Sequence, residues 1–306
     1  MNDTPPRRPL VCAWTNQADA LGEFAVFAGK TQSAEHIKPL HWYVACRLVL
    51  EGGFAPEDIT PRPPFRTVRK GGHFFLEFDP RLGAGGERTI LGGLKTKNVD
   101  VVVTRDGIGP VLAVSCKGVT GALRNLTNRM EETIGECTNL HITYPALVLG
   151  YLVLIRANTL EEGALAETAA PTSSPRRQLA ANDLALTQGG EPVAGIIRFH
   201  NALRELSGRR GIRDDVSQYE AVALSLVDMR PAFLLGQAFA PYPAGDSPLR
   251  LDQFFSTLAL RYDERFVYSA PDLANVTRRI AWAPASTAFQ AMTELSPIDY
   301  EIRRDG

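Results

Sequence analysis

The sequence of 306 residues is long enough for one large domain with a substantial core, so it needs neither disulfides nor a structural metal for stability. Its formal net charge is −1 and its pI is about 6.5, which argues against a non-specific DNA coat protein and confines any basic surface to a local patch. The four cysteines form no CxxC pair and the chain opens without an apolar signal segment, so we expect reduced thiols and a cytoplasmic location.

The first third of the chain alternates between regular and turn-rich segments. "KPLHWYVACRLVLEGG", residues 38–53, predicts a helix with Pro39 in its first turn and a glycine pair at its end. Residues 55–70 are rich in proline and basic side chains, residues 71–82 contain a strand, and the glycine-rich residues 83–98 lead to the next strand.

The central segment predicts a hairpin followed by a crossover. "VDVVVTRDGIGPVLAVSCKG" has two apolar runs around a short turn, so residues 99–104 and 111–117 should pair as antiparallel strands. Residues 120–142 have the apolar spacing of a helix, and "YPALVLGYLVLI" at 144–155 is typical of a core strand. That apolar run is shorter than the roughly 20 residues that cross a bilayer, so no membrane partner is expected. Strand, helix and strand predict a right-handed crossover between parallel strands.

The remaining chain continues the alternation. Residues 157–193 are rich in small and turn-forming residues and predict a flexible surface loop. Helical patterns follow at 193–206 and 250–266, with a buried strand between them at 219–229. The sequence therefore predicts an α/β (α+β) fold, a mixed β-sheet flanked by helices, in a single domain over 1–306.

Two charged residues, Asp100 and Lys117, lie in the predicted hairpin, where burying a charge is energetically unfavourable. Side chains alternate along a strand, so Ser115 and Lys117 share one face while Cys116 points to the other face as a buried, inert thiol. The antiparallel pairing brings Asp100 near Lys117. A plain ion pair at the sheet's end is the alternative, although desolvation makes such pairs poor stabilisers.

The helix that follows can place further polar groups over this strand end. Arg124, Asn128 and Glu131 are spaced by four and three residues and therefore lie on one helical face. The other charged side chains of the helix are expected on a solvated, self-paired face: Arg129, Glu132 and Glu136.

Asp100 and Glu131 together offer the hard oxygen ligands that Mg²⁺ prefers. A nearby lysine can orient a water nucleophile or hold a phosphate, and the metal ion neutralises the charge that develops on phosphorus. This combination indicates phosphodiester cleavage, with Mg²⁺ as the cofactor.

The residues "VDVVV…AVSCKG" resemble the signature of the PD-(D/E)XK nuclease superfamily, in which an Asp on one strand precedes an acidic-x-Lys tripeptide on the next. Val99 stands in place of the proline and Ser115 in place of the second acid. One branch, the restriction endonucleases that read CCGG-centred sites, is similar in having Ser-x-Lys with the glutamate moved to the following helix, about fourteen residues beyond the lysine. Glu131 lies fourteen residues after Lys117. The resemblance covers about residues 95–155.

The resemblance implies a Mg²⁺-dependent, site-specific type II restriction endonuclease that leaves 5′-phosphate ends. Asp100 and Glu131 would hold the metal, Lys117 would orient the nucleophile and Ser115 would support the site. Its partners would be double-stranded DNA, a second copy in a homodimer, and a cognate DNA methyltransferase as functional companion. The expected DNA-binding residues are Arg124, Asn128, Lys95, Lys97, Arg209, Arg210 and Arg213.

Several alternatives stay open. Glu51, at the end of the first helix, resembles in kind the glutamate that many restriction enzymes bring from an N-terminal helix, or it is a solvated helix end. The basic segment 208–213 is either a solvated turn or a phosphate-contacting loop. The same fold could carry an inactive site and only bind DNA, which depends on whether Glu131 faces the cluster. A repair or junction-resolving nuclease that reads DNA structure is the third possibility.

Overall fold

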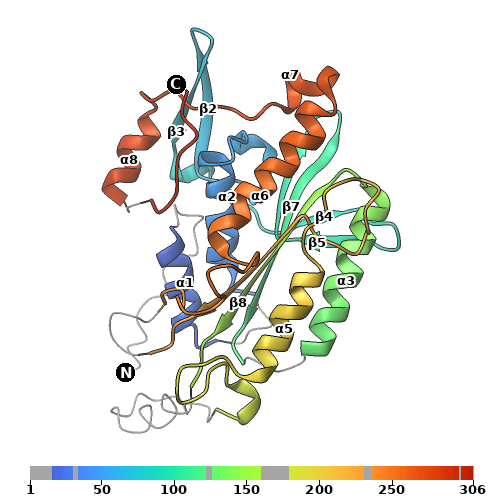
Figure 1. Ribbon diagram of the computed structural model, residues 1–306. Helices are drawn as coiled ribbons and strands as arrows, with labels where there is room; N and C mark the ends of the chain where they lie inside the picture. The colour runs from blue at the N-terminus through green and yellow to red at the C-terminus, as the bar shows by residue number, and fades with distance from the viewer. Residues whose placement is uncertain are drawn as a thin grey trace.

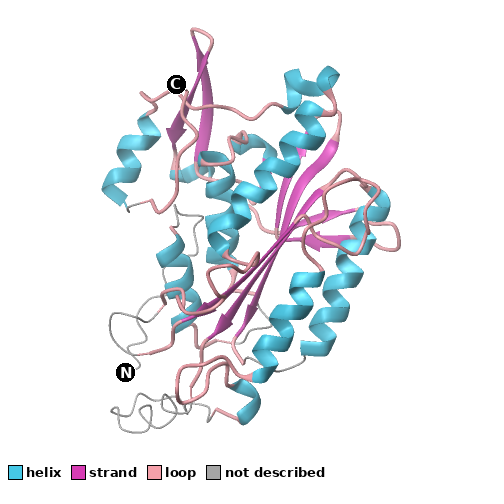
Figure 2. Ribbon diagram, viewed as in Figure 1, coloured by secondary structure: helices cyan, strands magenta, loops and turns pink. Residues whose placement is uncertain are grey.

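The computed structural model describes residues 16–29, 34–121, 126–159, 179–230, 236–295 and 298–305. It is a mixed α+β fold in which a five-stranded sheet lies between two layers of helices (Figures 1 and 2). The predicted α/β class, with a mixed sheet flanked by helices, is confirmed.

The central sheet has the strand order β1–β6–β7–β8–β9. Its strands are β1 (Ile59–Thr60), β6 (Val101–Arg105), β7 (Gly109–Val119), β8 (Val148–Arg156) and β9 (Ala221–Val227). β1, β6 and β7 pair antiparallel, whereas β7, β8 and β9 pair in parallel. β8 and β9 are buried along almost their whole length, as parallel strands covered on both faces usually are.

The β6–β7 pair confirms the predicted hairpin, with Val101 opposite Val114. α3 (Leu126–Thr143) then connects β7 to β8, which pair in parallel, so the predicted strand, helix and strand are present. One detail differs from the prediction. The first strand of the hairpin is interrupted at Asp100, which separates β5 (Lys97–Val99) from β6.

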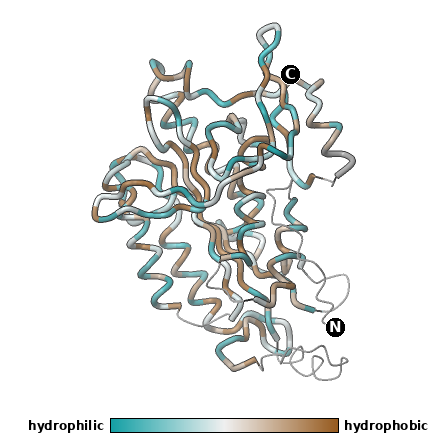
Figure 3. Tube along the Cα trace, turned by 180° about the vertical axis from the view of Figure 1, so that it is seen from behind, coloured by the Kyte–Doolittle hydropathy of each residue, from teal (hydrophilic) through white to brown (hydrophobic). Residues whose placement is uncertain are grey.

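Helices cover both faces of the sheet. α1 (Gln17–Val26), α2 (Lys38–Leu50) and α6 (Leu251–Tyr262) lie on one face, and α3 and α5 (Ala194–Glu205) lie on the other (Figure 1). Each face has its own hydrophobic cluster, and the apolar residues concentrate along the sheet (Figure 3). No helix in the described ranges is both long enough and apolar enough to span a bilayer.

α2 begins at Lys38 with Pro39 in its first turn, as predicted, but it is buried on every side. The C-terminal part of the chain covers the side that the sheet does not: the Trp282 indole donates a hydrogen bond to the Val49 carbonyl, 2.8 Å, and the Arg303 backbone N–H donates to the Leu50 carbonyl, 2.8 Å. Because α2 is buried, any side chain that it contributes to a functional site is itself largely enclosed by protein.

Two short ribbons accompany the sheet. β2 (Phe65–Lys70) pairs with β3 (His73–Phe78), and β4 (Arg88–Ile90) pairs with β5. β3 was predicted, whereas β2 and β4 were hidden by proline and glycine patterns that usually mark turns. The remaining short elements are 3-10 turns at Pro56–Asp58, Pro80–Leu82, Ala181–Asp183 and Pro271–Leu273, a π-helical turn at Asp263–Tyr268, and the helices α7 (Ala274–Thr277) and α8 (Thr287–Leu295).

The predicted flexible loop over 157–193 is only partly testable, because residues 160–178 lie outside the described residues. The described remainder is packed. Asn158 is buried and donates hydrogen bonds to the carbonyls of Thr120, 3.0 Å, and Asp183, 2.9 Å. Leu186 is buried in the cluster beneath α3 and α5. Other side chains of residues 179–193 are exposed, among them 180–182 and 187–189, so the flexibility of this segment stays a prediction.

Candidate active site

Asp100 occupies the break between β5 and β6, beside the middle of β7. Its Oδ2 atom accepts a hydrogen bond of 2.7 Å from the backbone N–H of Cys116, and the residue is only 6% exposed. A backbone donor fixes the orientation of the carboxylate without any help from a ligand. The side chain is thus preorganised at the point where the β4–β5 ribbon joins the central sheet.

Lys117 pairs with Asp100 as predicted, with Nζ 3.5 Å from Oδ2. Burial alone would lower the pKa of Lys117, but the negative charges of Asp100 and Glu136 outweigh it and raise that pKa. The lysine is therefore protonated at neutral pH. It can donate hydrogen bonds to an anion, but it cannot act as a general base.

The second carboxylate beside this pair is Glu136, from α3. The Ser115 hydroxyl donates a hydrogen bond to Glu136 Oε1, and Lys97 Nζ lies 2.7 Å from Oε2. The Glu136 side chain is 2% exposed, whereas the sequence predicted it on a solvated face. Ser115 is thus in the site, and it positions a carboxylate that sequence reasoning assigned elsewhere.

The prediction that Glu131 is a metal ligand in the cluster needs correction, because Glu131 lies on the exposed side of α3. Five residues separate it from Glu136, which is about 140° around a helix. The apolar Ile134 is 39% exposed, whereas the polar Thr133 is buried, with its hydroxyl 2.9 Å from the Tyr151 hydroxyl. The buried face of α3 therefore differs from the face that hydropathy would select, because its polar side chains have hydrogen-bond partners on the sheet.

His41 is a site residue that the sequence did not reveal. Its Nε2 atom lies 3.6 Å from Asp100 Oδ1, is buried and has no hydrogen-bond partner among the described residues. Burial lowers the pKa of His41 even though Asp100 opposes this, so the ring is neutral at neutral pH. A single histidine in a helix gives no metal-ligand spacing, so no sequence signal could have found it.

Glu51 lies away from this cluster. It is ten residues beyond His41 on α2, about 15 Å along the helix axis. Its carboxylate pairs with Arg47, whose guanidinium carbon lies 4.2 Å from the centre of the Phe255 ring. The structure therefore assigns Glu51 to a packing role at the helix end and does not bring it to the predicted catalytic position.

Two adjoining hollows open at the cluster. The first, of about 420 Å³, is called here the α2 hollow and is lined by Ala34, Lys38, His41, Trp42, Pro61, Gly85, Gly86 and Glu87. The second, of about 480 Å³, is the lysine hollow, lined by Glu87, Lys95, Thr96, Lys97, Asn98, Asp100 and Lys117. Glu87 borders both hollows, so they lie next to each other, with His41 in the wall of the first and Asp100 in the wall of the second.

The donor set fits a hydrated divalent cation. Asp100 Oδ1 and His41 Nε2 are close to each other without forming a hydrogen bond, as two ligands that share a third partner would be. Mg²⁺ often takes only one or two protein carboxylates and keeps several waters, while an imidazole suits the softer Mn²⁺ better. In the described residues, no group of three or more His, Cys, Asp or Glu converges as a complete ligand set. The oxygens of Glu136 are already paired with Ser115 and Lys97.

The predicted DNA-binding residues are widely separated. Lys95 and Lys97 line the lysine hollow, although Lys97 is paired with Glu136. Arg124 lies outside the described residues, and Asn128 is exposed on the first turns of α3. The expected self-pairing on α3 is confirmed for Arg129 and Glu132, which are 3.4 Å apart.

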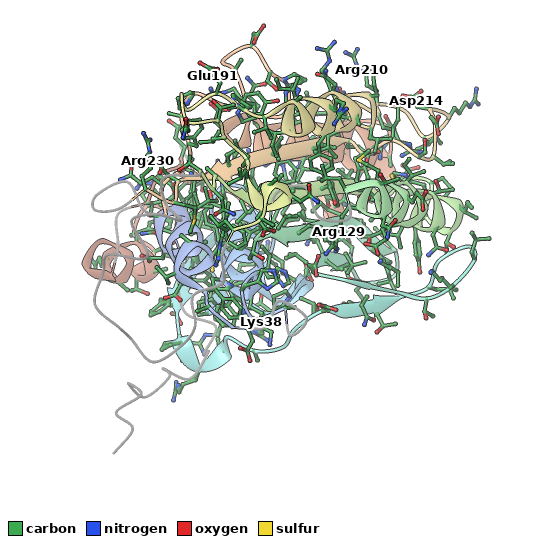
Figure 4. All side chains as sticks on the ribbon, turned by 90° about the horizontal axis from the view of Figure 1, so that it is seen from below. Lys38, Arg129, Glu191, Arg210, Asp214 and Arg230 are labelled. Carbon is green, nitrogen blue, oxygen red and sulfur yellow. The ribbon has the colours of Figure 1, made fainter. Side chains whose placement is uncertain are left out.

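Arg209 is another correction, because it is fully buried and pairs with Glu220 at 2.8 Å. It serves the interior instead of a DNA surface. Arg210 and Arg213 are exposed, but Figure 4 places Arg210 at the opposite edge of the molecule from Lys38 of the α2 hollow. Arg210 therefore lies far from that hollow, and a phosphate contact by this segment stays a prediction.

Comparison with protein-family models, with curated proteins and with solved structures gives no match to this chain. Its function must therefore be argued from the geometry of the Asp100 cluster.

Proposed function

We propose that this chain is a metal-dependent endonuclease that hydrolyses phosphodiester bonds in double-stranded DNA. The observation that carries the proposal is the Asp100–Lys117 pair, 3.5 Å apart at the wall of a hollow that two further lysines line. A fixed carboxylate, a charged lysine and the exposed Lys95 at the same hollow together suit a phosphodiester better than a small neutral substrate.

Each side chain of the cluster has its own role in the proposed reaction. Asp100 and His41 would hold Mg²⁺ or Mn²⁺, with Glu136 as a further ligand that Ser115 orients. Such a cation supplies polarisation of the phosphoryl oxygens and activation of a water nucleophile at neutral pH. Lys117 donates to a non-bridging phosphate oxygen and stabilises the charge that builds there. In the reaction, a water molecule loses a proton to solvent as its oxygen bonds to phosphorus, the bond to the 3′ oxygen breaks, and that oxygen takes up a proton from solvent.

The finer proposal is a type II restriction enzyme. It rests on the resemblance of "VDVVV…AVSCKG" to the PD-(D/E)XK signature, with Glu136 now in the part of the displaced glutamate. Cleavage of both strands at a palindrome requires two sites related by a two-fold axis, so the active form would be a homodimer with a companion methyltransferase to protect host DNA. The products would carry 5′-phosphate ends.

Two observations favour a second candidate, a DNA-binding protein without nuclease activity: Glu131 is exposed instead of facing the cluster, and the remaining glutamate, Glu136, is already paired. Lys97 Nζ pairs with Glu136 Oε2 and the Ser115 hydroxyl donates to Oε1, so both oxygens of this carboxylate already have partners. If that pair persists when DNA and metal are present, only Asp100 and His41 remain as ligands.

The test is incubation of the purified protein with plasmid or phage DNA of known sequence, with Mg²⁺ or Mn²⁺ and with EDTA. Discrete fragments that need the metal would support a site-specific endonuclease, and mapping their ends would give its recognition site. A smear would support a nuclease without sequence preference. Intact DNA under every metal, together with retention on a gel-shift assay, would favour the binding-only candidate.

A further inference from the structure

The loop between β4 and β5, residues 91–96, exposes two leucines. Leu94 is 80% exposed, the highest value among the large hydrophobic side chains in the described ranges, and Leu91 is 60% exposed. Single exposed leucines are common and need no explanation by themselves. What distinguishes this pair is how rigidly the loop is held.

Asn139 of α3 clamps the loop backbone. Its Oδ1 atom accepts hydrogen bonds from the N–H groups of Leu94, 2.8 Å, and Lys95, 3.1 Å, while its Nδ2 donates to the Lys95 carbonyl, 2.8 Å. Its backbone carbonyl accepts a fourth bond, from the Gly93 N–H, 2.8 Å. Asn139 is 2% exposed, so a buried polar side chain is devoted to fixing an exposed loop.

The two glycines of the loop allow this close contact. A Cβ atom on Gly92 would lie 2.0 Å from Asn139 Nδ2, and one on Gly93 would lie 2.2 Å from the Ile142 Cγ2 atom. The loop is therefore pressed against α3, with the Leu94 side chain left on the solvent side. A loop that needed only to connect two strands would not need such a fit.

The clamp also sets the position of Leu94 relative to the site. The residues that follow it in the loop, Lys95, Thr96 and Lys97, line the lysine hollow together with Asp100 and Lys117. Lys95 is exposed and has no acidic partner among the described residues. The exposed Leu94 side chain therefore lies next to Lys95, an exposed lysine at the rim of the lysine hollow.

We propose that the β4–β5 loop inserts Leu94 into a groove of duplex DNA while Lys95 binds a flanking phosphate; this inference rests on the proposed function. Apolar side chains that enter a base step are a known way to unstack and bend a duplex, and a rigid backbone avoids the entropy cost of ordering the loop on binding. The adjacent lysines favour DNA over an apolar protein surface, which would leave Lys95 without a partner.

The test compares Leu94→Ala with Leu260→Ala, since Leu260 is a 50% exposed leucine on α6, at the opposite face of the sheet. The probe is a short duplex carrying the site mapped in the cleavage assay, with 2-aminopurine at the steps next to the cut, measured in EDTA. We expect the native protein and Leu260→Ala to raise 2-aminopurine fluorescence. Leu94→Ala should lose that rise and bind the duplex about tenfold more weakly. Both variants should melt at the native temperature, because neither side chain is buried.

Equal binding and equal fluorescence for Leu94→Ala, in a protein that still cleaves plasmid, would overturn the inference and leave the nuclease function standing. A change in sedimentation of Leu94→Ala without DNA would instead identify the loop as a contact between copies of the chain, and would also overturn it. Failure of the native protein to bind or cleave DNA would remove the proposed function first, and this inference with it.

Discussion

The Ser115 hydroxyl donates a hydrogen bond to Glu136, 21 residues further along the chain, and this contact joins the edge of the sheet to the inner face of α3. Ser115 thus holds a carboxylate of α3 in place on the strand that also carries Lys117. Glu136 is buried and Glu131 is exposed, so the two glutamates of one helix form a matched pair for mutation.

Glu136→Gln should reduce metal-dependent cleavage by about a hundredfold or more, because a neutral amide is a poor ligand and leaves Lys97 without its partner. Glu131→Gln should cleave at the native rate. Initial rates on supercoiled plasmid at saturating Mn²⁺ measure both. The reverse order of effects would show that α3 has another orientation in the active protein and would restore the predicted role of Glu131.

The sequence predicted the hairpin and the strand–helix–strand unit of the central sheet, but neither β1 nor the buried face of α3. Strand alternation predicted the Asp100–Lys117 pair because backbone geometry alone determines which strand side chains meet. The buried face of α3 could not be predicted from hydropathy, because the groups that make Thr133, Glu136 and Asn139 tolerable in the interior come from elements distant in the chain. Arg209 misled for the same reason: its partner Glu220 is invisible in a local basic pattern.

Lys117→Ala should abolish cleavage and leave specific DNA binding largely intact. Lys117 has a folded pKa above its usual value, so its charge stabilises the fold below about pH 10.5 and this contribution is lost as the pH rises through the folded pKa. The lysine is therefore cationic throughout the neutral range, and cleavage should show no basic limb from its deprotonation below about pH 10. A gel shift in EDTA and a plasmid assay in Mn²⁺ separate the two properties; simultaneous loss of both would contradict the assigned role.

His41→Asn should weaken Mn²⁺ binding by about tenfold or more and reduce the preference for Mn²⁺ over Mg²⁺, because an imidazole suits Mn²⁺ better than Mg²⁺. Metal titration followed by thermal denaturation measures this without any need for DNA. Unchanged stabilisation by Mn²⁺ would show that the ring lies beside the metal site but does not contact the ion.

The same variant should alter the dependence of stability on pH. Burial lowers the folded pKa of His41, whereas the unfolded chain titrates near pH 6.5. Below that value the unfolded state binds the additional proton first, so the free energy of unfolding falls as the pH drops toward the folded pKa. His41→Asn should flatten this acid limb between about pH 7.5 and 5.5 in urea titrations. His36, whose pKa is also lowered by burial, keeps its own contribution in that variant, so part of the limb remains.

Lys97→Met tests whether the ammonium group stands in for a cation. Lys97 Nζ lies 2.7 Å from Glu136 Oε2, and the lysine is 30% exposed while the carboxylate is almost completely buried. Without metal, the variant should lose roughly 1–3 kcal/mol of stability, because Glu136 retains the Ser115 hydroxyl but loses its charged partner. Added Mn²⁺ should then stabilise Lys97→Met by more degrees than it stabilises the native protein, since the carboxylate is available to the ion. Lys95→Met, two residues earlier in the chain, is the control and should behave like the native protein in these measurements of stability and Mn²⁺ binding. A loss of stability that Mn²⁺ does not restore would show that Glu136 cannot reach the ion, and would favour the binding-only function over the nuclease.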